Sequence, residues 1–223
     1  MRMLLLLLLA AQMRLSNASA ADCLTIGVPA GAGASAEVMH IVQQIGQTAG
    51  ICLNPLRAPR NRLDELAADG AVLPLPAAPG AGSRLMALPT PLTTFVGSLY
   101  WPASRPEPSG TNAVIGIVLG QDWAKRAAES RGATAYEVRD NKQLFDMMAA
   151  GRLDGMILPS ISFRHFLHRY PALADCEMKP LQELPMLFLL DRSHLAMAQS
   201  LDRAIATLRR SGVIESEFSK YER

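Results

Sequence analysis

The chain has 223 residues, and its 22 lysines and arginines nearly balance its 20 aspartates and glutamates. The basic residues are scattered along the sequence, so neither the net charge nor its distribution indicates a nucleic-acid partner. Aromatic residues make up only 5% of the chain, which argues against a surface that stacks on sugars.

The first twenty residues have the pattern of a secretory signal peptide. Arg2 gives a basic start, Leu4–Ala11 is an apolar run, and residues 18–20 (Ala-Ser-Ala) form a small-residue cleavage site. The run is too short to span a membrane as a helix, and no later segment is long and apolar enough to do so. We therefore expect residues 1–20 to be cleaved near Ala20, and the mature protein to be periplasmic and not membrane-spanning.

The next part of the chain alternates predicted strands and helices. Gly50 ends the first predicted helix and Gly70 the second, whose cap is Asn61. The first helix has its apolar residues at helical spacing, capped by Ser35. In chain order the expected elements are a strand at Leu24–Val28, a helix from Ser35 that carries Val38, Ile41, Val42 and Ile45, a strand at Ile51–Leu56, a helix at Arg62–Ala68 and a weak strand at Val72–Leu75.

A proline-rich segment separates this part from the rest. Residues 74–91 contain five prolines, and we expect no helix or sheet strand within them. Leu92–Trp101 then has the pattern of a long strand that leads out of the first half of the chain. Pro102–Gly110 is expected to be a loop.

The stretch Ala113–Leu158 gives the clearest pattern of strand, helix, strand, helix and strand. The first strand ends at Gly120, and its continuous apolar run is typical of a parallel strand that is buried on both faces. Asp122 is expected to cap the first helix and Asp140 the second, where Gln143 has capping-box spacing. The expected elements are Ala113–Leu119, Asp122–Arg131, Thr134–Val138, Asp140–Ala150 and Leu153–Leu158.

The C-terminal part adds one strand and three helices to the prediction. The strand can return the chain to its first half, which gives two crossing segments, Leu92–Trp101 outward and Leu184–Leu190 back. Ser193 is expected to cap a strong amphipathic helix that Gly212 ends. The expected elements are Ser162–Arg169, Leu184–Leu190, the helix from Ser193 and a short helix at Val213–Tyr221.

The sequence has three cysteines, in a compartment that permits disulfides. Cys23 precedes the first predicted strand and Cys52 opens the second. If these strands are parallel neighbours, both sulfurs lie at the same end and can form a bridge, which leaves Cys176 as a free thiol. No cysteine or histidine pair has a complete set of metal ligands around it, so we expect neither a metal nor another cofactor.

Three stretches resemble the extracytoplasmic solute-binding proteins of family 3, the bilobed receptors that feed polar amino acid ABC importers. They are Val114–Gly120 (VIGIVLG), Asn141–Leu158 (NKQLFDMMAAGRLDGMIL) and His194–Tyr221 (HLAMAQSLDRAIATLRRSGVIESEFSKY). The resemblance implies an α/β, two-lobed periplasmic-binding-protein-like fold with parallel-core sheets and two hinge strands. It places residues 21–98 and 187–223 in the first lobe and residues 99–186 in the second.

In such a fold the solute lies beyond the carboxyl ends of the parallel strands, where helix N-termini present free N–H groups. Gly120 and Gln121 occupy this place in the second lobe. Arg60 follows the second strand and has either a surface role or an anion contact. Arg84 lies near where the resemblance places an arginine that grips a carboxylate, or is a surface arginine. Tyr100 can line the hinge or pack between the lobes.

The resemblance also implies an acidic residue, after the last strand of the second lobe, that pairs with a substrate ammonium. Here that position is Pro159, which can neither carry charge nor donate a proton. Ser160, the next residue, can still form a hydrogen bond with a ligand. Recognition of an ordinary α-amino acid is therefore in question for this chain.

We expect a non-enzymatic receptor that captures a small polar, anionic solute for an ABC permease. One alternative is an accessory or sensor protein of a periplasmic redox or quinoprotein system, with no transport role. A dehydratase on the same fold is a further alternative. It needs an acid–base pair that we do not identify in the sequence, and no nucleophile–His–acid order is evident.

Overall fold

The computed structural model describes residues 23–29, 35–58, 62, 73–75 and 84–221. The predicted signal peptide and most of the helix predicted at Arg62–Ala68 lie outside these residues. The helices, strands and short 3-10 turns (η) are β1 Leu24–Pro29, α2 Ser35–Ala49, β2 Leu53–Ala58, β3 Leu73–Leu75, β4 Leu85–Ala87, β5 Thr93–Pro102, β6 Val114–Val118, α4 Asp122–Glu129, β7 Thr134–Val138, α5 Asn141–Ala149, β8 Gly155–Pro159, α6 Ser160–Leu167, η2 Pro171–Leu173, β9 Cys176–Asp191, η3 Arg192–His194, α7 Leu195–Arg210 and α8 Val213–Tyr221.

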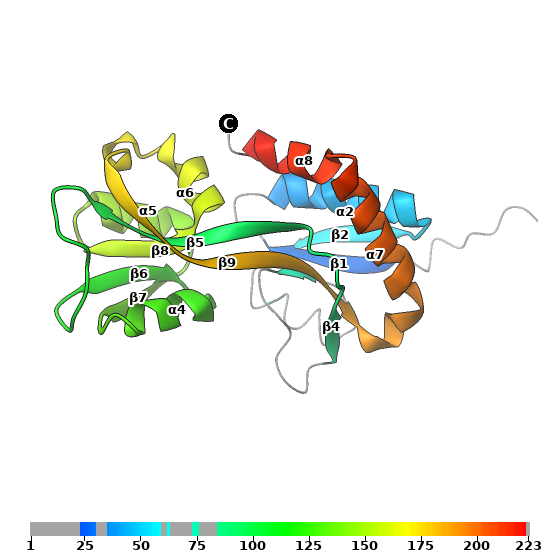
Figure 1. The fold of residues 1–223 in the computed structure, drawn as a ribbon, viewed down its shortest axis with the longest axis horizontal. Helices are drawn as coiled ribbons and strands as arrows, with labels where there is room; N and C mark the ends of the chain where they lie inside the picture. The colour runs from blue at the N-terminus through cyan, green and yellow to red at the C-terminus, as the bar shows by residue number, and fades with distance from the viewer. Residues whose placement is uncertain (1–22, 30–34, 59–61, 63–72, 76–83, 222–223) are drawn as a thin grey trace, which may run out of the picture.

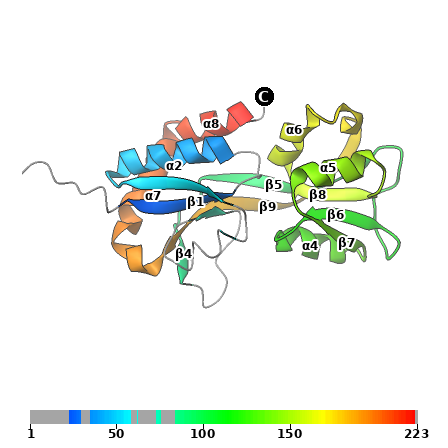
Figure 2. The same ribbon diagram turned by 180° about the vertical axis from the view of Figure 1, so that it is seen from behind.

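These elements form two lobes that the long strands β5 and β9 connect (Figure 1). The first lobe contains β1, α2, β2, β3, β4, α7 and α8, and the second contains β6, α4, β7, α5, β8 and α6. Strands β5 and β9 lie side by side from one lobe to the other, as the view from behind also shows (Figure 2). The two-lobed α/β fold with two connecting strands, expected from the sequence, is confirmed.

The sheets combine parallel and antiparallel pairing. In the first lobe β1 and β2 are parallel, from Leu24 opposite Leu53 to Pro29 opposite Ala58. The second sheet of the described residues has the order β3-β9-β5-β8-β6-β7, and β4 also pairs with β9. Within it β6 is parallel to both β7 and β8, whereas β5 is antiparallel to β8 and β9. The expected parallel core is therefore present in each lobe. Every antiparallel pair includes one of the two connecting strands, β5 or β9.

Close packing of helices on the sheet explains why the second lobe's strands are so apolar. Helix α4 lies on one face of its sheet, and α5 and α6 lie on the other (Figure 1). All five residues of β8 are buried. A Cβ atom on Gly116 of β6 would lie 2.6 Å from a Leu144 methyl and 2.5 Å from a Leu153 methyl, so only glycine lets these side chains approach the strand.

The first lobe has its core between β1 and three helices. Val38, Ile41, Val42 and Ile45 of α2 are all buried, as their helical spacing predicts. Helix α2 packs against α7 and α8, so the C-terminal part of the chain completes the lobe that the N-terminal part begins. The return of the chain through β9 makes this packing possible.

Cys23 and Cys52 form a disulfide, with Cα atoms 4.6 Å apart. The parallel pairing of β1 and β2 places both residues at the same end of the two strands, as expected. Cys176 is a free, half-buried thiol at the start of β9. Burial raises the pKa of Cys176 to about 11, and the nearby Asp175 carboxylate acts in the same direction.

The weak strand expected at Val72–Leu75 is confirmed as β3, but the expectation that residues 74–91 hold no strand is wrong. Pro74 lies within β3, opposite Phe188 of β9, and β4 pairs with the end of β9 from Leu85 opposite Asp191 to Ala87 opposite Leu189. Both strands have only three residues. Because β3 is the edge strand of its sheet, its proline can be accommodated where no further strand needs an N–H donor.

Strand β9 is much longer than the predicted Leu184–Leu190, since it begins at Cys176. Its additional residues pair with β5 as far as Pro102. Pro180 and Pro185 do not end the strand, because there β9 pairs on one side only within the described part of the chain. Non-local pairing thus overrides the local proline signal.

Two predicted helix caps are wrong, and one is confirmed. Asp122 is the first residue of α4, whose N-cap is Gln121. Ser193 lies in the 3-10 turn η3, where its N–H donates to Asp191 at 2.8 Å, so Asp191 caps that turn, and the N-cap of α7 is His194. Asp140 caps α5 as expected, because its side chain accepts from the Gln143 N–H at 2.8 Å.

Candidate functional site

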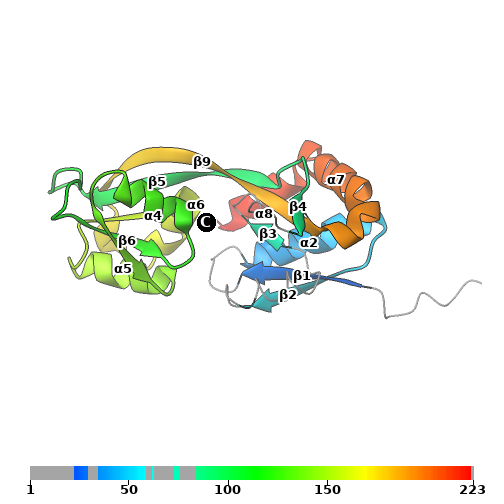
Figure 3. The same ribbon diagram turned by 90° about the horizontal axis from the view of Figure 1, so that it is seen from below.

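The carboxyl ends of β6, β7 and β8 meet at one edge of the second lobe, because these strands are parallel neighbours. Figure 3 shows β6 pointing toward the first lobe and α6 beginning on the same side. The same figure shows β1 and β2 of the first lobe pointing toward the second. The loops that follow β1 and β2 lie outside the described residues, as does Arg60.

Helix α4 begins at this edge without a side-chain cap. Gly120 has φ +80°, a left-handed conformation that suits glycine, and it turns the chain from β6 into the helix. Gln121 is the N-cap, and its side chain makes no capping hydrogen bond. Its Oε1 atom is buried and has no hydrogen-bond partner among the described residues. An unpaired buried acceptor beside free helix N–H groups is a feature that a bound ligand can satisfy.

Helix α6 also begins at this edge, directly after β8. Pro159 is its N-cap, with an extended backbone, and no side chain caps the helix. Pro159 ends the strand, one residue beyond its predicted end, and Ser160 is the first residue of the helix, two residues before its predicted start. The first turn of α6 contains no acidic residue, and Ser160 is half-buried. Its N–H groups and helix dipole favour a negatively charged group.

The edge contains one acidic residue that opposes an anion at α4. Asp122 is exposed and lies in the first turn of that helix. Asp140, which follows β7, already accepts a hydrogen bond from the Gln143 N–H as the cap of α5. The start of α6 is therefore more favourable for an anionic group than the start of α4.

Tyr100 lies inside the second lobe. Its ring is buried and stacks on Phe163 of α6, with centroids 3.9 Å apart and planes 5° from parallel. Burial raises the pKa of Tyr100, and the Ser98 hydroxyl and the Arg164 charge offset part of this effect. Tyr100 thus supports α6 from beneath and is not at the exposed strand ends.

Arg84 lies elsewhere, beside the end of β9. Its Nε atom is 3.3 Å from a carboxylate oxygen of Asp191, and its backbone carbonyl accepts from the Arg192 N–H at 3.0 Å. Gly97 of β5 pairs with both Pro159 and Gln182, so the start of α6 lies near Gln182. From there to Asp191 is about 30 Å along the strand at ~3.3 Å per residue. The structure thus brings Gly120, Gln121 and Ser160 to one edge, and Arg84 lies apart from them.

Sequence reasoning missed Asn141 at the same edge. It is the first residue of α5, is 5% exposed, and its Oδ1 atom has no hydrogen-bond partner within the described part of the chain. The neighbouring Asp140 carried the capping signal, so the sequence offered no reason to single out Asn141. Its burial depends on how α5 packs, which no local pattern reveals.

The described residues contain no group of three histidine, cysteine or acidic side chains placed to hold a metal ion. Within the same residues, no helix has the length and apolar content needed to cross a membrane.

No family model and no curated protein matches the sequence. Solved structures do match the fold. The GluR0 ligand-binding core in complex with L-glutamate has a TM-score of 0.75 at 12% identity, covering 92% of this chain and 100% of that one. The substrate-binding protein of an amino acid ABC transporter has a TM-score of 0.69 at 14% identity, covering 88% of this chain and 98% of that one.

A third neighbour is an ancestral amino-acid-binding protein that is a precursor of cyclohexadienyl dehydratase. Its TM-score is 0.71 at 12% identity, with 91% of this chain and 96% of that chain covered. At these identities the likeness establishes the fold, which is that of two-lobed amino-acid-binding proteins. This agrees with the resemblance to solute-binding proteins of family 3.

Proposed function

We propose that this chain is a periplasmic receptor, without enzymatic activity, that binds a small polar solute through a carboxylate and delivers it to an ABC importer. The lobes close on the solute by bending at β5 and β9, and the bound solute stabilises the closed form. The signal peptide proposed at residues 1–20 directs the chain to the periplasm. The first lobe comprises residues 21–98 and 187–223, and the second comprises residues 99–186.

The observation that carries the proposal is the pair of uncapped helix N-termini at adjacent strand ends. Helices α4 and α6 both begin at the carboxyl edge of the second lobe without a side-chain cap, whereas α5 next to them is capped by Asp140. The uncapped N–H groups need acceptors, and a solute carboxylate supplies two oxygens. Gln121 and Ser160 add side-chain hydrogen bonds at the same place.

The solved structures support a solute of the amino acid class. The neighbours named above are an L-glutamate complex, a substrate-binding protein of an amino acid transporter and an amino-acid-binding ancestor. They do not indicate whether the solute is anionic overall, and they lend no support to the accessory or sensor role. Pro159 removes one position for an acidic partner, so an ammonium group needs another acceptor at this edge, such as the Gln121 side chain or the exposed Asp122 carboxylate.

A thermal-shift screen tests the proposal directly. The mature protein is heated with each L-amino acid, with small organic acids and with the amide derivative of each compound that gives a shift. A solute at a hundred times its Kd adds about 2.7 kcal/mol to the free energy of unfolding, which corresponds to roughly 5–10 °C in Tm for a chain of this size. A carboxylate compound should raise Tm and its amide should not. No shift across the panel, or equal shifts with acid and amide, would contradict the proposal.

Variants at the start of α6 locate the site. Ser160→Asp places a negative charge beside the proposed carboxylate and should weaken binding at least about tenfold, since like charges at one helix terminus repel. Ser160→Ala removes only one hydrogen bond and should cost about threefold to tenfold. Ser130→Asp at the exposed far end of α4 is the matched control and should leave affinity unchanged.

A further inference from the structure

The connection between the lobes is narrowest over one short stretch of the two long strands. Strand β8 begins to pair with β5 at Gly97, and β3 begins to pair with β9 at Leu187. Between these points Thr93–Val96 and Glu183–Met186 pair with each other and with no further strand of the described residues. A two-stranded ribbon is the least supported part of the sheet, so bending between the lobes should concentrate here.

A β-bulge lies at the second-lobe end of this ribbon. Gly97 is opposite Gln182, but Ser98 is opposite Pro180, so Leu181 is an extra residue in β9. Bulges bend a strand and increase its local twist. The position of the bulge therefore helps to set the angle at which the connecting strands leave the second lobe.

The Trp123 side chain of α4 lies directly on this point. A Cβ atom on Gly97 would be 2.6 Å and 2.8 Å from two carbons of the Trp123 ring and 2.9 Å from a methyl carbon of Leu184. Such distances leave no room for a side chain, so glycine at position 97 lets the indole ring rest on the strand backbone. Trp123 is 9% exposed and is therefore packed into the hinge, not presented to solvent.

The contact continues across the ribbon into the first lobe. Leu184 is directly opposite Phe95, and residues opposite each other in antiparallel strands share a face. The Phe95 ring meets the Phe218 ring of α8 edge to face, with centroids 5.5 Å apart. All four side chains belong to one buried apolar cluster. We call Trp123, Leu184, Phe95 and Phe218 the hinge seam, which joins α4 of the second lobe to α8 of the first.

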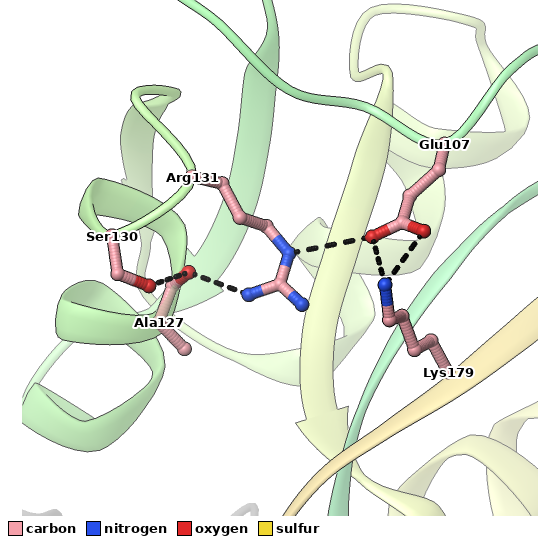
Figure 4. Close-up of polar contacts among 5 residues, drawn as sticks. All are labelled: Glu107, Ala127, Ser130, Arg131 and Lys179. Atoms are coloured by element: carbon pink, nitrogen blue, oxygen red, sulfur yellow. Dashed lines mark hydrogen bonds and ion pairs between the residues drawn. The ribbon is translucent and has the colours of Figure 1, made fainter.

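Charged side chains link the C-terminal end of α4 to β9. Glu107 accepts from Lys179 of β9, with both N–O distances at 2.9 Å, and is 3.7 Å from Nε of Arg131 (Figure 4). Arg131 also donates to the Ala127 carbonyl at 3.0 Å. A groove of about 370 Å³ lies between these contacts, lined by α4 and by Pro180–Gln182 of the bulge. Helix α4 thus contacts Gly97 of β5 at its start and is linked to Lys179 of β9 through Glu107 beyond its end.

We propose that Trp123 is a positioning residue that holds the hinge, and that the hinge seam keeps the lobes in the arrangement of this structure until a solute binds at the start of α4. Trp123 follows Gln121 and Asp122 directly in the chain. A solute that accepts hydrogen bonds from the first N–H groups of α4 and shifts this end of the helix therefore also shifts the Trp123 ring that rests on Gly97. The part that concerns the solute rests on the proposed function. The part that concerns the hinge does not.

Distance distributions between two spin labels test the hinge in the absence of any solute. Cysteines introduced by Gln199→Cys on α7 and Ala149→Cys on α5, in a Cys176→Ala background, place one label on each lobe; both positions are exposed. The seam predicts a narrow distribution that Trp123→Ala broadens and Trp123→Phe broadens less. Trp101→Ala, which removes the other tryptophan of the chain from the far end of β5, should leave the width unchanged.

An unchanged width in Trp123→Ala would overturn the proposal, as would equal broadening in Trp101→Ala. If Trp123→Ala does not fold, Gly97→Ala replaces it, because its added methyl group must displace the ring and should also change the distribution. The same labelled protein is then measured with 1 mM L-glutamate, about a thousand times a Kd of about 1 μM. No change with L-glutamate or the other amino acids would count against the proposed function alone, while the solute-free widths still decide the hinge claim.

Discussion

Asp140 shows how much one residue contributes to the local order of the candidate site. Its carboxylate accepts from the Gln143 N–H at 2.8 Å and caps α5, while the Gln143 side chain accepts from the Arg139 N–H at 3.0 Å. Asp140→Ala should lower the free energy of unfolding by about 1 kcal/mol, because one helix N–H loses its acceptor. Urea denaturation measures this loss. Asp140→Asn retains an equally good cap and should cost much less, and equal losses would contradict the capping role.

Asp191 makes the stability of the first lobe depend on pH. Hydrogen bonds from Ser193, and to a lesser extent the Arg84 charge, hold the pKa of this buried carboxylate below its ordinary value of 3.8. The unfolded chain therefore takes up a proton at a higher pH than the folded chain does. The stabilisation is present above about pH 4 and is lost as the pH falls through the folded pKa.

Asp191→Asn keeps an acceptor for the Ser193 N–H but cannot titrate. Its free energy of unfolding, measured in urea between about pH 5 and pH 2, should therefore fall less steeply than that of the wild type. Arg84→Gln removes only the smaller influence and should flatten the curve less. Parallel curves for the wild type and Asp191→Asn would show that this carboxylate is not the source of the acid sensitivity.

Single residues were predictable from the sequence where the interaction is local. The cap at Asp140 and the helix-ending glycines at positions 50 and 212, both of which are left-handed, follow from nearest neighbours along the chain. Asp122 and Ser193 were wrongly assigned as caps, because Asp122 is the first helical residue after the N-cap Gln121 and Ser193 lies in a 3-10 turn that Asp191 caps. The Gln121 and Asn141 oxygens that lack a partner among the described residues could not be predicted, since burial is a property of the packed lobe.

At the scale of elements, the disulfide joins the residues that directly precede β1 and β2. Cys23 and Cys52 are 29 residues apart, so the bridge closes a loop whose entropy in the unfolded chain corresponds to roughly 3–4 kcal/mol. Reduction, or the paired change Cys23→Ala with Cys52→Ala, should lower the urea midpoint accordingly. Cys176→Ala is the control and should keep its sensitivity to reductant. A midpoint that does not respond to reductant would contradict a bridged first lobe.

The boundaries of helices and strands differ most from the prediction where pairing with a distant strand outweighs the local sequence pattern. Helices and parallel strands of the second lobe were predicted within two residues, because apolar periodicity and glycine ends agree there. Strand β3 was predicted as the weak strand at Val72–Leu75, whereas β4 and the first half of β9 were missed, since the prolines around β4 and within β9 argue locally against strands. Each of these segments pairs with a strand distant in sequence, and such pairing tolerates prolines on an open edge.

At the scale of the whole molecule, the order of elements predicted two crossing strands, and the resemblance to solute-binding proteins of family 3 implied two lobes. It did not predict the hinge seam, since Trp123, Leu184, Phe95 and Phe218 come from four separate elements. It also did not place Arg84 beside Asp191, away from the strand ends. The arrangement of the lobes around the solute remains a proposal that requires a measurement in solution.

X-ray scattering from the mature protein, alone and with a saturating solute from the thermal-shift panel, makes that measurement. A receptor that closes on a carboxylate should have a smaller radius of gyration with the acid bound and an unchanged one with the corresponding amide. Ser160→Asp should prevent the change at the same solute concentration. An unchanged radius of gyration at saturation, or equal compaction with acid and amide, would contradict a two-lobed receptor that recognises a carboxylate at the start of α6.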